Sequence, residues 1–504
     1  MYTIENESLS AIADSIRKKT GKSEKISFPD GFVTEIDGIT TGGGDTPAVA
    51  VTEKDVNFYD YDGTLIAAYT ESEAAQLTEL PTPPTHDGLV FQQWIYTLDE
   101  VKENADAADV GALYTTDDGA TRLEVEVIDA DRGAINLNFT QSISNGTLID
   151  WGDGSEAERV SNTMVSVAHT YTATGPYTIS ILPDEYCELT LGYSEAMQIL
   201  SGVNTYNRTC PVLIRRAYMG DRVVGITDGA FKEFFELETI SMSKSIKSIR
   251  QFTFKSCSAL KFIALPAAVT ELKLQAFYQC YAMEHMSIGP KLTYIGINAC
   301  SLCLNLKRVV LIGKFSVLTT YSNFSNCSNL KTAILKNSND VKDVSEGMFS
   351  QCHKLKKFLY PGATKIGRHA FYESGLEEIE IPDTVTGLET TNGGGTFRDS
   401  YGLRRLVCPA GITKIPSYLA YNCKKMTHAE FLGDVTTIGT YAFYNCYSLK
   451  TIDLTHCTAV PSLESGEAFT NLAKDFEILV PAALADTWKT GTNWAKYADH
   501  IKGV

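Results

Sequence analysis

Between about Gly225 and Pro481, apolar and polar positions recur with a period of about 23 residues. In most units an aromatic residue comes three positions before a cysteine or serine, and a leucine or methionine comes three positions after it. A short strand-like run follows, such as EEIEIP (377–382), and a second apolar anchor such as SIKSI (245–249) closes the unit. A unit of this length cannot bury its apolar side alone, so stacked neighbours must share one core. The pattern predicts a solenoid of ten or eleven coils whose strands stack about 4.8 Å apart.

The cysteines follow the same period. Seven of them recur at intervals of 23, 23, 24, 25, 71 and 23 residues, and Ser374 and Ser400 fill the gap of 71. A disulfide framework would not alternate cysteine with serine, and Cys300 and Cys303 lack the second ligand pair of a zinc site. We therefore predict reduced, buried, structural thiols and no metal. The seven are Cys257, Cys280, Cys303, Cys327, Cys352, Cys423 and Cys446.

Units such as IGTYAFYNCYSLKTIDLT (438–455) and FTFKSCSALKFIALPAAVTEL (252–272) resemble BspA-type leucine-rich repeats over about half of the chain. The resemblance implies surface adhesion and partner binding rather than catalysis. The segment LVPAALADTWKTGTNWAKYADHI (479–501) resembles the helical tail that often closes such arrays. Trp488, Trp494 and Tyr497 are spaced to cover the last coil, as the end of a solenoid requires.

Side chains alternate along a strand, which predicts the outward face of the coils. If Ile263 and Leu265 point inward, Phe262 and Ala264 point outward. The cations on this face would suit an anionic polymer, and the alternative is a solvated face without a ligand. The candidate ligand-binding face consists of Phe262, His285, Arg308, Lys357, Arg405 and His428.

Tyrosines near the cysteine turns give a second candidate. Exposed aromatic rows can stack on sugars or anchor a protein partner, whereas half-buried rings would only pack the turns. The candidate aromatic row consists of Tyr278, Tyr281, Tyr372, Tyr401, Tyr444 and Tyr447.

The chain begins with a predicted small helical module (1–40), followed by a Gly-rich linker (41–49). The phrase IADSIRKKTGKS…FPDGF resembles a short module of bacteriophage tail and baseplate-associated proteins. The resemblance implies assembly in the bacterial cytoplasm and docking on other virion proteins. The N-terminus shows no apolar run typical of a signal peptide, and no stretch is long enough to insert in a membrane.

Two β-rich segments precede the solenoid. Residues 50–120 contain a hairpin signal around Asp62–Gly63, and the order of their motifs resembles internalin-type β-grasp repeats, with Trp94 as the expected core ring. Asp-Gly turns need no metal, so calcium there stays an open alternative. Residues 121–185 contain WGDGS and HTYTATGPYTI, which resemble a PKD-type immunoglobulin-like sandwich. Trp151 and Tyr171 would then be buried. Residues 186–224 are expected to lead into the first coil.

The charge distribution and the absence of enzyme signatures reduce the number of function classes that fit the sequence. The 504 residues carry a net charge of −17, with 28 acidic and 5 basic residues in 41–200 but 26 acidic and 34 basic residues in 201–504. This balance disfavours a nucleic-acid binder that relies on overall charge. Sequence signatures of serine hydrolases, zinc proteases, P-loop proteins and dinucleotide-binding proteins do not occur. We predict no catalytic residues and no cofactor.

The sequence thus predicts a multidomain, mainly β protein: a β-grasp-like module, an Ig/PKD-like β-sandwich, a leucine-rich-repeat solenoid (225–481) and a helical C-terminal cap (482–504). The preferred function is a non-enzymatic, tail-associated virion protein whose solenoid binds a host-surface polysaccharide or protein. A bacterial cell-surface or secreted adhesin is the alternative, and a tail-associated polysaccharide-degrading enzyme is a second one. Self-association of the chain is left open.

Overall fold

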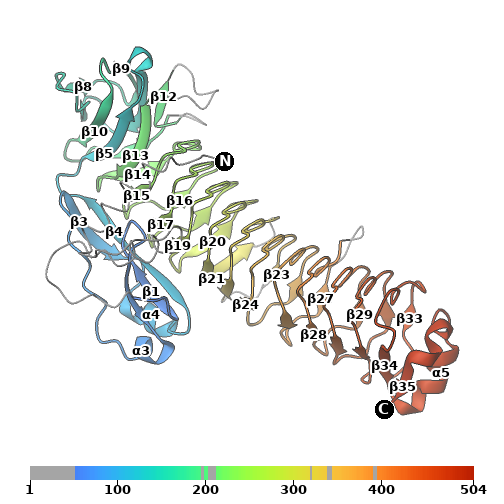
Figure 1. The fold of residues 1–504 in the computed structure, drawn as a ribbon. Helices are drawn as coiled ribbons and strands as arrows, with labels where there is room; N and C mark the ends of the chain where they lie inside the picture. Colours follow the sequence, from blue (N-terminus) through green and yellow to red (C-terminus); the bar gives the residue numbers. More distant parts are fainter. Residues whose placement is uncertain (1–50, 194–197, 203–211, 318–320, 338–342, 390–393) are drawn as a thin grey trace, which may run out of the picture. The chain divides into compact units, whose positions relative to one another are not determined.

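The computed structural model describes residues 51–193, 198–202, 212–317, 321–337, 343–389 and 394–504 (Figure 1). The predicted N-terminal module and its linker lie outside these residues. The chain divides into two units, Met1–Thr52 and Glu53–Val504, and the second is described below.

The first part of this unit is a small mixed sheet with strand order β2-β1-β4-β3. Strands β1 and β4 are parallel, whereas β2 and β3 pair antiparallel on the outside. Two short helices follow Thr70 and Thr97, each of which closes a capping box with a glutamate three residues later. The Trp94 ring is buried and packs edge-on against Phe58 at 5.1 Å, as the sequence predicted. The elements are β1 (Val56–Tyr59), β2 (Leu65–Tyr69), α3 (Glu71–Ala75), β3 (Leu89–Trp94), α4 (Leu98–Glu103) and β4 (Ala108–Thr116).

The second part is a sandwich of two sheets, with strand orders β15-β13-β5-β10-β7-β8 and β12-β6-β11-β14, and β9 beside β6. Trp151 and Tyr171 are both buried as predicted, and the Tyr171 hydroxyl donates to the Trp151 carbonyl at 2.9 Å. The strands are β5 (Thr121–Val127), β6 (Ala134–Gln141), β7 (Thr147–Asp150), β8 (Glu158–Val160), β9 (Met164–Thr170) and β10 (Gly175–Pro183). The remaining strands are β11 (Leu189–Leu191), β12 (Leu200–Gly202), β13 (Val212–Tyr218) and β14 (Val223–Ile226), with a 3-10 turn at Ala130–Arg132.

The segment 186–224, which was expected only to connect to the first coil, also contributes strands to the sandwich. Strands β11 and β12 complete one sheet of the sandwich, and β13 pairs antiparallel with β5 and parallel with β15 of the first coil. As a result, one hydrophobic core continues from the sandwich through the coils to the C-terminal cap.

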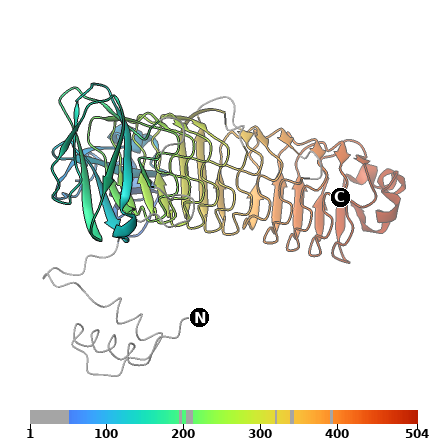
Figure 2. The same cartoon turned by 90° about the horizontal axis from the view of Figure 1, so that it is seen from above.

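The solenoid consists of coils stacked in one row (Figure 2). Most coils carry two short strands, and each strand pairs in parallel with a strand of a neighbouring coil. Strand β21 is longer and takes part in both lines, because it pairs with β22 through Arg308–Gly313 and with β20 further on. The first line contains β15 (Thr239–Ser241), β17 (Phe262–Ala264), β19 (His285–Ser287), β21 (Arg308–Val317), β22 (Thr332–Asn337), β24 (Lys357–Leu359), β26 (Glu378–Glu380), β28 (Arg405–Cys408), β30 (His428–Phe431), β32 (Thr451–Asp453) and β34 (Glu477–Val480). The second line contains β16 (Ser248–Ile249), β18 (Glu271–Leu272), β20 (Leu292–Ile295), β23 (Asp343–Val344), β25 (Lys365–Ile366), β27 (Gly387–Leu388), β29 (Lys414–Ile415), β31 (Thr437–Ile438) and β33 (Ser462–Leu463).

Ladders of identical side chains fill the coils. Phe254 stacks on Phe277 with ring centroids 5.2 Å apart, and Phe371 stacks on Phe397 at 5.6 Å. The cysteine of each coil donates its S–H to a carbonyl of the preceding coil; Sγ of Cys280, for example, lies 3.1 Å from the Phe254 oxygen. Ser400 makes the same bond to the Phe371 oxygen at 2.7 Å. Serine therefore replaces cysteine in this ladder because both side chains supply a donor at the same place.

The eleven cysteines of the described residues are free and buried, which confirms the predicted structural thiols. Burial raises the pKa of Cys446 to about 12, because the thiolate would lose its hydration. We expect N-ethylmaleimide to leave Cys446 unmodified in the folded protein at pH 7 and at pH 9, and to label it after denaturation. Peptide mapping by mass spectrometry measures this.

A Tyr447→Cys variant supplies the matched control, because Tyr447 is 51% exposed and directly follows Cys446. The new thiol should react quickly in the folded variant. Labelling of Cys446 at a similar rate would contradict the buried ladder.

The C-terminal end is closed by one helix, 3-10 turns and a last strand. Trp488, Trp494 and Tyr497 are buried on the last coil, where Trp494 Nε1 donates to the Pro461 carbonyl at 2.8 Å and Tyr497 packs edge-on against Phe469. The elements are a 3-10 turn at Ala482–Leu484, α5 (Ala485–Thr490), a 3-10 turn at Ala495–His500 and β35 (Ile501–Gly503), which pairs with β34.

Candidate functional site

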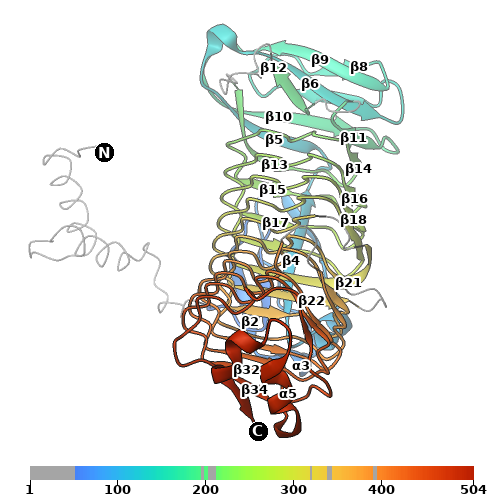
Figure 3. The same cartoon turned by 90° about the vertical axis from the view of Figure 1, so that its right-hand side faces the viewer.

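The outward side of the first line of strands, from β17 to β34, is called the strand face below. Its inward and outward positions alternate as predicted: Ile263 lies in the solenoid core, whereas Phe262 and Ala264 lie in a second core. That second core is the core of the module formed by β1–β4, which packs on the strand face over β17–β22 (Figure 1). Seen along the solenoid, the module lies behind the C-terminal coils (Figure 3). The strand face therefore has a covered half (β17–β22) and an open half (β24–β34).

The covered half meets the module closely. A Cβ atom added to Gly111 of β4 would lie 2.5 Å from the Cβ of Ala264, so only glycine allows this approach of the two backbones. Outward apolar side chains of the coils complete the module core. These side chains are Phe262, Ala264, Val310, Ile312 and Ile334.

Polar contacts fix the same junction. Arg308 donates from its two terminal nitrogens to the carbonyls of Lys54 and Asp55, both at 2.7 Å. The Tyr96 hydroxyl donates to the Ile288 carbonyl at 2.7 Å, and Ser287 donates to the carbonyl of Asp109. Bonds of this kind satisfy backbone groups that the junction buries, so the module and the coils form one packed body.

Three of the six residues predicted for a ligand-binding face are therefore not open to a ligand from solution. Phe262 and His285 are 2% and 7% exposed, and Arg308 is engaged by the module. His285 stacks on Tyr59 and lies 3.3 Å from a carboxylate oxygen of Glu53. Burial lowers the pKa of His285, which favours a neutral ring at pH 7.

The other three residues, Lys357, Arg405 and His428, lie on the open half. Arg405 pairs with Glu430 at 3.2 Å, and His428 lies 3.6 Å from the same carboxylate. Carboxylates outnumber cations among the outward positions, so this half does not fit the anionic polymer expected from the sequence. The outward charged side chains are Lys357, Glu378, Glu380, Arg405, Glu430, Asp453 and Glu477, besides His428.

The predicted aromatic row divides into two series. Tyr281, Tyr401 and Tyr447 directly follow the cysteine position and are 38%, 46% and 51% exposed. Tyr278, Tyr372 and Tyr444 come two positions before it and are half-buried.

Sequence reasoning missed Tyr418 and Tyr441, which lie five positions before the cysteines of two neighbouring coils. Each packs against a tyrosine of its own coil and against the other across the junction between the two coils. Their separation of 23 residues is the solenoid period, and that signal could have found them.

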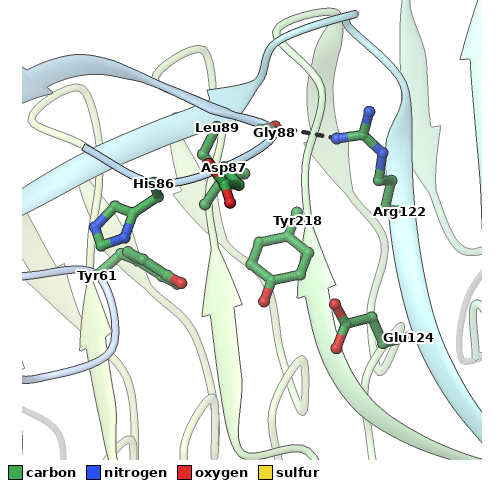
Figure 4. Close-up of a pocket in the computed structure, with 8 residues that line it drawn as sticks. All are labelled: Tyr61, His86, Asp87, Gly88, Leu89, Arg122, Glu124 and Tyr218. Carbon is green, nitrogen blue, oxygen red and sulfur yellow. Dashed lines mark hydrogen bonds between the residues drawn. The ribbon is translucent and has the colours of Figure 1, made fainter. Parts of the chain in front are cut away.

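A pocket of about 250 Å³ lies where the module, the sandwich and the strand β13 meet (Figure 4). Arg122 reaches across it to the Gly88 carbonyl at 3.1 Å and also pairs with Asp118. His86 pairs with Asp60 at 2.9 Å, and burial raises the pKa of that carboxyl. Arg122 thus joins the sandwich to the module, whereas the His86–Asp60 pair lies within the module. The lining residues are Tyr61, His86, Asp87, Gly88, Leu89, Arg122, Glu124 and Tyr218.

Within the described ranges, no group of three or more His, Cys, Asp or Glu side chains is arranged to hold a metal ion. No helix in that part of the chain has the length and apolar character needed to cross a bilayer.

The stacked coils, their aromatic and cysteine ladders and the continuous core define a parallel β-solenoid of leucine-rich repeats. Six copies of the BspA type Leucine rich repeat region match residues 214–331, 319–392 and 342–474, which together span just over half of the chain. The chain belongs to this family.

Solved structures of leucine-rich-repeat proteins are similar to the chain. A protein from Bacteroides ovatus is 20% identical, with 60% of this chain and 97% of that chain covered and a TM-score of 0.34. A leucine rich cell surface protein from Faecalibacterium prausnitzii is 20% identical, with coverages of 47% and 78% and a TM-score of 0.29. A protein from Eubacterium ventriosum is 18% identical, with coverages of 56% and 90% and a TM-score of 0.32. No curated protein sequence matches the chain.

Proposed function

We propose that the chain is a non-enzymatic adhesin of a bacterial cell surface, and that its solenoid binds a partner through the open half of the strand face. Membership of the BspA-type family supports the surface role. The observation that carries the binding role is the division of the strand face. Over β17–β22 the strand face packs against a folded module of the same chain. The open half has the same strand geometry, so it can pack against the surface of a second molecule.

The chemistry of the outward side chains indicates what the open half can bind. The covered half has apolar outward residues, which need permanent burial. On the open half, Glu378 and Glu380 are exposed, and the Arg405–Glu430 pair is accessible at the surface. Interfaces of reversible complexes are richer in polar groups than those of permanent complexes. The open half therefore fits reversible binding of a separately folded partner.

Adhesion of beads coated with the full chain tests this proposal. We expect the beads to bind bacterial cells or an epithelial cell layer, and a Glu378→Ala/Glu380→Ala/Arg405→Ala variant to bind at least about tenfold more weakly. Glu389→Ala is the matched control, because Glu389 is exposed and follows β27 of the other strand line. Wild-type beads that bind neither surface, or a triple variant that binds like wild type, would overturn the proposal.

A second candidate is a particle protein of a bacteriophage, with the same binding half. The phrase IADSIRKKTGKS…FPDGF supports it, and the module 1–40 would then dock on other virion proteins. Immunogold labelling with antibody to the solenoid distinguishes the two candidates. Label on cell envelopes supports the adhesin, and label on purified particles supports the virion protein.

A further inference from the structure

Six tyrosines gather on the turns of three neighbouring coils. Four of them repeat with the solenoid period: Tyr418 and Tyr421 in one coil are followed 23 residues later by Tyr441 and Tyr444 in the next. The ring centroids of Tyr421 and Tyr444 are 5.3 Å apart with 9° between the planes, and those of Tyr418 and Tyr441 are also 5.3 Å apart. We call this cluster the tyrosine edge; it consists of Tyr401, Tyr418, Tyr421, Tyr441, Tyr444 and Tyr447.

The tyrosine edge lies at the surface. Tyr401 and Tyr447 are about half exposed, and the other four rings are half-buried against one another. Rings that only filled the core would be covered, as Phe397 and Phe443 of the same coils are. Mutual packing already holds these four rings in place, so a ligand would lose little conformational entropy in ordering them.

An asparagine ladder runs through the same turns. Asn445 donates from Nδ2 to Oδ1 of Asn422 at 2.8 Å, Asn471 donates likewise to Asn445, and Asn422 donates to Asp399 at 2.7 Å. These residues have φ near +60°, a conformation that asparagine tolerates better than most residues. An amide has two N–H donors and two lone pairs, so a ladder bond on each side leaves capacity for ligand hydroxyls.

Charges at the tyrosine edge are balanced within the chain. Arg398 pairs with Asp399 at 3.2 Å and lies over the Tyr421 ring, 5.0 Å from its centre. The Lys424 ammonium lies over the Tyr401 ring at 5.2 Å. The Tyr441 hydroxyl bonds to Glu467, which raises the pKa of Tyr441 to about 12 and keeps the hydroxyl protonated. A surface with such pairing does not select a strongly charged ligand.

We propose that the tyrosine edge binds a neutral oligosaccharide. The C–H faces of sugar rings pack on exposed aromatic rings, and their hydroxyls bond to the amide and phenol groups beside them. The groups repeat once per coil, about 4.8 Å, which suits a chain of repeating sugar units rather than a single small molecule. This site lies on the turns and is independent of the strand face that carries the proposed adhesion.

Calorimetric titration of the full chain tests the inference. The probes are three neutral hexasaccharides (laminarihexaose, cellohexaose and mannohexaose) and an anionic hyaluronan hexasaccharide. We expect at least one neutral probe to bind more tightly than hyaluronan, and Tyr401→Ala/Tyr447→Ala to weaken that binding by about tenfold or more. Both rings are exposed, so the variant should keep the wild-type melting temperature.

Tyr281→Ala is the matched control, because Tyr281 has the same place after a cysteine but belongs to a coil outside the tyrosine edge. It should bind the neutral probe like wild type. The inference is overturned if no neutral probe binds, if hyaluronan binds more tightly, or if the double variant and the control lose equal affinity. Bead adhesion that persists in the double variant would leave the strand-face proposal intact, so the two failures can be told apart.

Discussion

Replacing Phe277 with alanine is expected to lower the free energy of unfolding of the solenoid by about 3–5 kcal/mol. The ring is fully buried and stacks on Phe254, and its backbone carbonyl also accepts the S–H of Cys303. Coils contact only their neighbours, so the cavity should weaken the interfaces on both sides of this coil. Urea unfolding followed by circular dichroism measures the loss.

Tyr281→Ala again gives the comparison, because Tyr281 lies four residues further along the same coil with its ring partly in solvent. Its cost should stay below about 1 kcal/mol. Equal losses in the two variants would mean that the phenylalanine ladder is not what holds the coils together.

Replacing Val310 with aspartate is expected to detach the module from the coils, at a cost of about 3 kcal/mol or more. Val310 is 3% exposed and points from β21 into the module core. An unpaired carboxylate at this place must regain water, and it can do so only if the module lifts away. Hydrogen exchange should then rise in β1 and β4 while the coils beyond β24 stay protected.

The control for this change is Leu359→Asp. Leu359 has the equivalent outward position on β24, but it belongs to the open half and is 44% exposed. Exchange in the module should not change. If Leu359→Asp detached the module as well, the boundary between the covered and open halves would be in the wrong place.

Much of the solenoid could be predicted from the sequence, because the ladder positions admit few residue types. Phe254, Cys257 and Leu260 recur with a fixed spacing, and the alternation of Phe262, Ile263 and Ala264 gave the correct inward and outward sides. The family resemblances of the module and the sandwich stay predictions, although Trp94, Trp151 and Tyr171 are buried as expected.

The covered half of the strand face could not be predicted from alternation alone. Outward residues are exposed only if nothing packs on them, and the module that covers Phe262 and His285 comes some 200 residues earlier in the chain. A local signal was nevertheless present. The run RVVLIG (308–313) is apolar at both inward and outward positions, which is typical of a strand buried on two sides, whereas EEIEIP alternates.

The two closed ends of the coil stack limit how copies of this chain can meet. At one end β13 hydrogen-bonds to β5, and at the other β35 hydrogen-bonds to β34 and is flanked by Ala482 and Ala485. A bare terminal strand would be a template for fibre growth by addition of further chains. Because β13 pairs with β15 and β35 pairs with β34, neither terminal strand of the coils is left as a bare edge on which a further chain could add a coil.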